Sequence, residues 1–195
     1  MGGQALRKIA IVTGAIIIIV GLIIYFLNSF QGGVVSAEFT SARQKAASIS
    51  QEIVNLTSET SRKISEANIV QKGGGVNQLL ELINQAKMTN AAAYQKAFDL
   101  SRALQEMASS LGGVGQGRQQ IGYEAMALEL SLVSEFISYT DTLNNFLNNL
   151  SKAVIDQNPA SRRAAEDAIK NVNQKAELIN NLNRDFLQKM SVFDQ

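Results

Sequence analysis

Residues 79–111 read LLELINQAKMTNAAAYQKAFDLSRALQEMASSL and carry a long, regular apolar repeat. Apolar residues and one asparagine recur at alternating spacings of four and three, at Leu79, Ile83, Ala86, Asn90, Ala93, Ala97, Leu100, Leu104, Met107 and Leu111. A repeat that averages 3.5 residues keeps these side chains on one face of an α-helix. The stretch therefore predicts a long helix that packs on other helices through a coiled-coil-like seam.

Glycine and proline divide the region after residue 36 into segments of similar length. Breaks at 72–75 and 111–117 are rich in glycine, and the break at 158–159 holds the single proline of the chain. Both residue types disfavour a helix interior. We expect helices at about 37–71, 76–111, 118–157 and 160–192, each with a similar seam. Four such helices with short connections predict an elongated antiparallel four-helix bundle, with helical hairpins completed by another chain as the alternative.

The N-terminal region contains an apolar run at 9–27 whose polar side chains are those of Thr13 and Tyr25 alone. As a helix this run would span roughly 28 Å, close to the hydrocarbon thickness of a bilayer. The predicted fold is therefore all-α, with a single transmembrane helix at 9–30 ahead of the bundle and the lipid bilayer as a partner. The residues expected in the membrane anchor include Ile9, Ile16, Ile17, Ile18, Ile19, Leu22, Ile23, Ile24, Tyr25 and Phe26.

The distribution of charge predicts the orientation of this anchor. Arg7 and Lys8 precede the apolar run, and the first acidic residue is Glu38. Because basic residues favour the cytoplasmic side, we expect a cytoplasmic stub at 1–8, a linker at 31–36 and an extracytoplasmic bundle at 37–195. A cleaved signal peptide is the alternative, since Val35-Ser36-Ala37 resembles a cleavage site, but the run exceeds the roughly 7–15 residues of a signal core. An uncleaved signal anchor is therefore favoured.

Composition excludes several classes of function. The 195 residues contain no cysteine and no histidine, so no disulfide, thiolate nucleophile, imidazole base or ordinary zinc site can form. Lys and Arg number 18 against 17 Asp and Glu, a balance without the basic excess of nucleic-acid-binding proteins. We expect no enzymatic activity, no cofactor, no metal and no nucleic-acid partner.

Polar residues interrupt three of the predicted seams and are the candidate functional residues. They are Asn90 in the second segment, Glu135 and Tyr139 in the third, and Asn183 in the fourth. A buried polar group without a partner is costly, so each must pair within the bundle or contact a ligand or protein partner. We interpret the asparagines as residues that fix helix register. Glu135 and Tyr139, one turn apart, form a candidate contact face for a ligand.

Two further predictions concern local structure. The seam of the third segment is assigned to Ile121, Ala125, Leu128, Leu132, Glu135, Tyr139, Leu143, Phe146 and Leu150. A second apolar stripe at Met126, Leu130, Val133 and Ile137 predicts that this helix is the most deeply buried or meets a partner. Ser161 is expected to cap the fourth helix, because serine is a preferred N-cap residue.

Abundant apolar and amide-rich helical surface, without a catalytic constellation, favours a non-enzymatic function. We expect a structural or accessory subunit of a larger membrane or envelope assembly, with protein partners that include further copies of the chain. The alternative is an extracytoplasmic sensory or ligand-binding module that signals through a membrane partner. In layout alone, such a module resembles the extracytoplasmic four-helix domains of bacterial chemoreceptors and sensor kinases.

Overall fold

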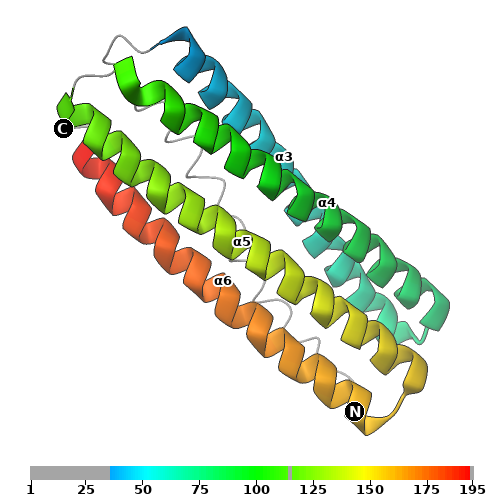
Figure 1. The fold of residues 1–195 in the computed structure, drawn as a ribbon. Coiled ribbons are helices and arrows are strands. Elements are labelled where there is room, and N and C mark those ends of the chain that lie inside the picture. The colour runs from blue at the N-terminus through cyan, green and yellow to red at the C-terminus, as the bar shows by residue number, and fades with distance from the viewer. Residues whose placement is uncertain (1–35, 114–115, 194–195) are drawn as a thin grey trace.

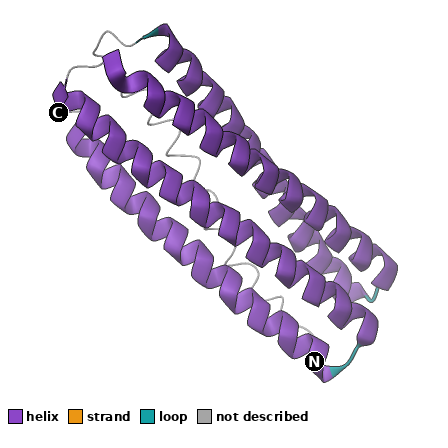
Figure 2. Ribbon diagram, viewed as in Figure 1, coloured by secondary structure: helices purple, strands orange, loops and turns teal. Residues whose placement is uncertain are grey.

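The computed structural model describes residues 36–113 and 116–193, and these form four long helices. They are α3 (Ala37–Gly73), α4 (Val76–Ser109), α5 (Gln116–Asp156) and α6 (Pro159–Phe193), with a short 3₁₀ helix, η2 (Ser110–Gly113), after α4. Within these ranges there is no strand (Figure 2). The prediction of an all-helical bundle is therefore confirmed for this part of the chain, and each helix end lies within two residues of its expected position.

The helices run alternately up and down and lie side by side (Figure 1). Their close backbone approaches are mainly between successive helices, α3 with α4, α4 with α5, and α5 with α6. The α3–α4 turn and the α5–α6 turn lie at the same end of the bundle (Figure 1). With a rise of about 1.5 Å per residue, helices of this length make a rod about 50 Å long.

Among the helices at 36–113 and 116–193, none is long and apolar enough to cross a membrane. The predicted transmembrane helix at 9–30, with its anchor residues from Ile9 to Phe26, lies outside the described residues. The same holds for the stub at 1–8 and for residues 31–35 of the linker. The membrane anchor therefore stays a prediction.

Local sequence explains where α3 begins and ends. The Ser36 hydroxyl accepts a hydrogen bond from the Phe39 amide at 3.1 Å, which satisfies one of the free N–H groups of the first turn. At the other end Gly74 has φ of 80°, and its amide bonds to the carbonyl of Gln71. This left-handed conformation is accessible to glycine at little cost, so Gly74 ends the helix and starts the turn to α4.

The start of α6 differs from the prediction. The helix begins at Pro159, and Asn158 accepts the Ser161 amide at 2.8 Å, so Asn158 rather than Ser161 is the N-cap. Proline at the first helical position is already set in helical geometry and has no N–H to satisfy, which moves the start toward the N-terminus. Ser161 donates instead to the Asp156 carboxylate at 2.8 Å. Gln157 precedes the cap with φ of 52°, in the left-handed region.

The core follows the seam of α4 closely. All ten predicted seam positions, Leu79 to Leu111, are buried. Ala86, Ala93 and Ala97 are at most 1% exposed, and their small side chains allow neighbouring helices to approach. Between η2 and α5, a methyl group added to Gly122 would lie 3.2 Å from both terminal methyls of Leu111, so glycine fits this close approach.

Part of the seam assignment of α5 is wrong, whereas Met126 and Val133 of the predicted second stripe are buried. Ile121 is 38% exposed, and Leu128 is only partly buried. A neighbouring row with the same spacing of four and three is buried instead: Met126, Glu129, Val133, Phe136, Thr140, Leu143, Leu147 and Leu150. Ala125, Leu132, Tyr139 and Phe146 are buried beside it. The wide buried face follows from the position of α5 between α4 and α6.

Candidate functional site

The predicted polar residue of α4 forms a link between two helices. Asn90 is 3% exposed, and its Nδ2 donates to the main-chain carbonyl oxygen of Thr140 on α5 at 2.7 Å. The Thr140 hydroxyl donates in turn to the Ile137 carbonyl at 2.8 Å. The donor group of Asn90 is thus satisfied within the chain, in a contact that depends on the register of α4 against α5.

A second polar link joins α3 to α4 one residue before Asn90. The hydroxyls of Thr60 and Thr89 are hydrogen-bonded at 2.8 Å, and Thr60 is 2% exposed. Each hydroxyl also lies within hydrogen-bond distance of a carbonyl in the preceding turn of its own helix. Together with Asn90 and Thr140, these threonines form a polar layer across α3, α4 and α5. This layer was not predicted, because a threonine at a seam position does not by itself indicate a hydrogen bond between helices.

Glu135 and Tyr139 do not form the joint contact face that their spacing suggested. The Glu135 side chain is 29% exposed and accepts from Lys175 Nζ on α6 at 2.9 Å, forming an ion pair at the α5–α6 boundary. Tyr139 is 1% exposed, with its ring 6.1 Å from that of Phe136. No described residue hydrogen-bonds the Tyr139 hydroxyl. Burial raises the pKa of this phenol above its ordinary value.

The carboxylate that lies inside the bundle is Glu129, which we did not predict as a site residue. It sits in the buried row of α5 between Met126 and Val133 and is 9% exposed. Its Oε2 has no hydrogen-bond partner among the described residues. Burial raises the pKa of the Glu129 carboxyl from 4.5 to about 7, because the charged form loses its hydration. The signal that could have found it is the second row of α5, which has the same heptad spacing.

Other polar groups lie at the level of Glu129. Since Glu135 pairs with Lys175 and the helices are antiparallel, Glu129 lies opposite the part of α6 that contains Asn180 and Asn183. Asn183, a predicted site residue, is 1% exposed. Within residues 36–113 and 116–193, Asn180 Oδ1 finds no hydrogen-bond partner. This end of the α5–α6 pair therefore holds a carboxyl and two amides in a largely apolar setting.

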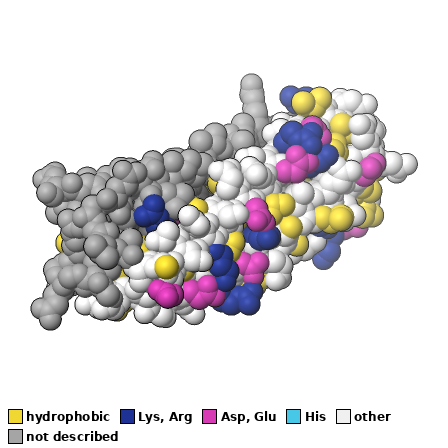
Figure 3. Space-filling view, turned by 90° about the horizontal axis from the view of Figure 1, so that it is seen from above, with side chains coloured by type: hydrophobic (Ala, Val, Ile, Leu, Met, Phe, Trp, Pro, Cys, Tyr) yellow, Lys and Arg dark blue, Asp and Glu magenta, His cyan; other side chains and the backbone are white. Residues whose placement is uncertain are grey.

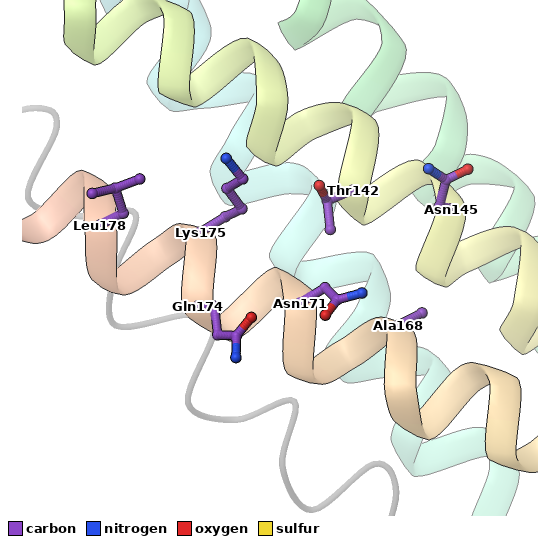
Figure 4. Close-up of a pocket in the computed structure, with 7 residues that line it drawn as sticks. All are labelled: Thr142, Asn145, Ala168, Asn171, Gln174, Lys175 and Leu178. Atoms are coloured by element: carbon purple, nitrogen blue, oxygen red, sulfur yellow. The ribbon is translucent and has the colours of Figure 1, made fainter.

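A shallow groove runs along the boundary of α5 and α6, near the Glu135–Lys175 ion pair. Its volume is about 470 Å³, and its lining residues are Thr142, Asn145, Ala168, Asn171, Gln174, Lys175 and Leu178. Figure 4 shows Thr142 and Asn145 on α5, with the other five on α6. The lining is rich in side-chain amides, which can both donate and accept hydrogen bonds. None of these asparagines was predicted as a site residue from the sequence.

No family model, no curated protein and no solved structure matches the chain. Among the residues that the structure describes, no three acidic side chains come together in a way that could hold a metal ion. What the described geometry offers is a polar layer, a buried carboxyl and an amide-lined groove. The first two lie inside the bundle, and the groove is open to solvent.

Proposed function

We propose that the chain is a non-enzymatic, membrane-anchored helical-bundle protein that serves as a structural or accessory subunit of a larger membrane or envelope assembly. In this proposal the helix at 9–30 crosses the bilayer with its N-terminus in the cytoplasm, and the bundle is extracytoplasmic. The apolar run and the flanking Arg7 and Lys8 support the anchor and its orientation.

The cap of α3 supports a retained anchor over a cleaved signal. Ser36 caps the helix through its side chain, and cleavage after Ala37, the alternative to a retained anchor, would remove this residue. Loss of a serine cap typically costs about 1 kcal/mol of stability. If the anchor is retained, the full-length protein should stay in the membrane fraction after alkaline carbonate extraction. Release of a shortened chain that begins at Glu38 would contradict the anchor.

The observation that carries the proposed function is the face of α4 that points away from α3 and α5, which we call the α4 outer face and define as Asn84, Met88, Ala91, Ala92, Gln95 and Phe98. All six residues are exposed. Met88 is 67% exposed and Phe98 is 43% exposed, and the Phe98 ring packs edge-on against Tyr94 at 5.0 Å. Neighbouring exposed apolar side chains on one face are characteristic of protein interfaces.

A pair of variants tests whether this face holds the chain in an assembly. Full-length Met88→Ser/Phe98→Ser should sediment as a smaller particle than the wild-type protein after gentle extraction from its membrane. Ile155→Ser is the matched control, because Ile155 is 64% exposed but lies at the end of α5. Circular dichroism should show both variants folded, since no core position is changed. If the double variant sediments like the wild type, the α4 outer face does not hold the assembly.

The groove between α5 and α6 favours a second candidate function, a ligand-binding module. Exposed amides at Asn145, Asn171 and Gln174 suit a neutral polyhydroxylated ligand. Lactose is a simple probe of this chemistry. Its titration should shift the side-chain amide NMR signals of these three residues in a saturable way, and should leave those of Asn84 on α4 unchanged. Unchanged groove signals would contradict this candidate.

A further inference from the structure

We infer that the α4 outer face binds the same face of a second copy of this chain, with the two α4 helices antiparallel. This inference rests on the proposed function and names one partner for it. A two-fold pair requires that a surface complement itself, so that each residue meets its counterpart across the axis. The charges and shapes along α4 meet this requirement about the midpoint between Ala91 and Ala92.

Charge is complementary in the antiparallel arrangement. Glu81 lies ten residues before Ala91, and Arg102 lies ten residues after Ala92. Both side chains are exposed on the same side of α4 as Met88 and Gln95. Antiparallel pairing places Glu81 of each copy opposite Arg102 of the other. Parallel pairing would place like charges opposite each other at both positions, which is unfavourable.

Shape is complementary about the same midpoint. Met88 lies three residues before Ala91, and Gln95 lies three residues after Ala92, so antiparallel pairing sets each Met88 against Gln95 of the second copy. The two exposed alanines occupy the crossing point, where small side chains allow helix axes to approach to about 8 Å. The Met88 side chain, 67% exposed here, would become covered. The pairing would therefore remove the apolar Met88 side chain from water.

Ion pairs engage several charged residues of α4. Lys96 and Glu106 pair with Glu52 and Lys45 on α3. Arg102 pairs with Asp99 one turn earlier on α4, and because an exposed pair of this kind contributes little, Arg102 stays available to Glu81 of a second copy. Figure 3 shows hydrophobic side chains scattered among charged ones on the face that it presents, over described residues.

The absence of native cysteine permits a direct test by disulfide cross-linking of the purified full-length protein in detergent. At an interaxial distance of about 8 Å, with Cα atoms about 2.3 Å from each axis, the two copies of residue 92 lie within the roughly 4.4–6.8 Å that a disulfide requires. Ala92→Cys should form a covalent dimer under mild oxidation at least tenfold faster than the control Ala164→Cys. Ala164 is likewise exposed but lies on α6. Equal rates would overturn the inference.

Charge reversal provides an independent readout in the Ala92→Cys background. Glu81→Arg should slow cross-linking by setting two arginines opposite each other, and Glu81→Arg/Arg102→Glu should restore the rate. A double variant as slow as the single one would overturn the antiparallel pairing. Because the purified protein contains no other subunit, failure here is distinct from failure of the proposed function. A native complex that persists while Ala92→Cys does not cross-link would reject self-pairing alone.

Discussion

Replacing Glu129 by glutamine should remove a pH-dependent loss in the free energy of unfolding that the buried carboxyl causes. The carboxyl has a pKa of about 7 in the folded protein, against 4.5 when solvated. The folded state therefore favours the protonated acid, and its stability is greatest below about pH 4.5 and falls as the pH rises through about 7. At about 1.4 kcal/mol for each pH unit, the total loss is about 3 kcal/mol.

Glu129→Gln keeps the shape of the side chain but cannot ionise. The free energy of unfolding of this variant relative to the wild type should therefore increase by about 3 kcal/mol between pH 4.5 and pH 8. Urea unfolding of the two full-length proteins, followed by circular dichroism at 222 nm, measures this difference at each pH. Glu135→Gln is the matched control on the same helix, because Glu135 is partly exposed and ion-paired with Lys175, a pair that contributes about 1 kcal/mol or less.

One result would refute the reasoning about Glu129. If the stability difference between Glu129→Gln and the wild type is the same at pH 4.5 and pH 8, the pKa of the Glu129 carboxyl does not change on folding. Glu129 would then contact water or a charged partner. Helix α5 would have to be rotated about its axis so that the row containing Glu129 faces solvent.

Three further substitutions test other parts of the fold. Asn90→Ala should lower the free energy of unfolding by about 1–3 kcal/mol, because it removes the hydrogen bond to Thr140; urea unfolding that shows no loss would mean that this bond is not formed. Leu100→Ala, at a position 4% exposed, should cost about 2–5 kcal/mol by the same assay, and a change near zero would place Leu100 outside the core. Gln157→Gly should raise stability by up to about 1 kcal/mol, because glycine tolerates φ of 52°; a lower melting temperature would contradict this conformation.

The helices were predictable because their signals are local. Gly73–Gly75 and Pro159 interrupt long heptad patterns, and the positions where the chain must turn follow from the backbone preferences of these residues. The α4 seam was also predictable, because its repeat is unbroken over ten positions, all of which are buried. Periodicity alone was sufficient for a helix with one dominant row.

The candidate site was less predictable because it depends on packing. α5 contacts helices on two sides, so several of its rows are apolar, and periodicity does not reveal which row is central. The choice of a row one residue away placed Glu135 in the core and missed Glu129. Similarly, the cap of α6 depends on competition between Asn158 and Ser161, which the proline between them decides in favour of Asn158.

The native mass of the full-length protein, extracted gently from its own membrane, tests the central claim most directly. Mass spectrometry would identify the proteins that accompany it. The proposed function predicts a complex of defined composition, larger than a dimer of the 21.1 kDa chain, that contains at least one other membrane or envelope protein. A monomer or dimer with no accompanying protein would contradict the subunit function and would direct attention to the groove between α5 and α6.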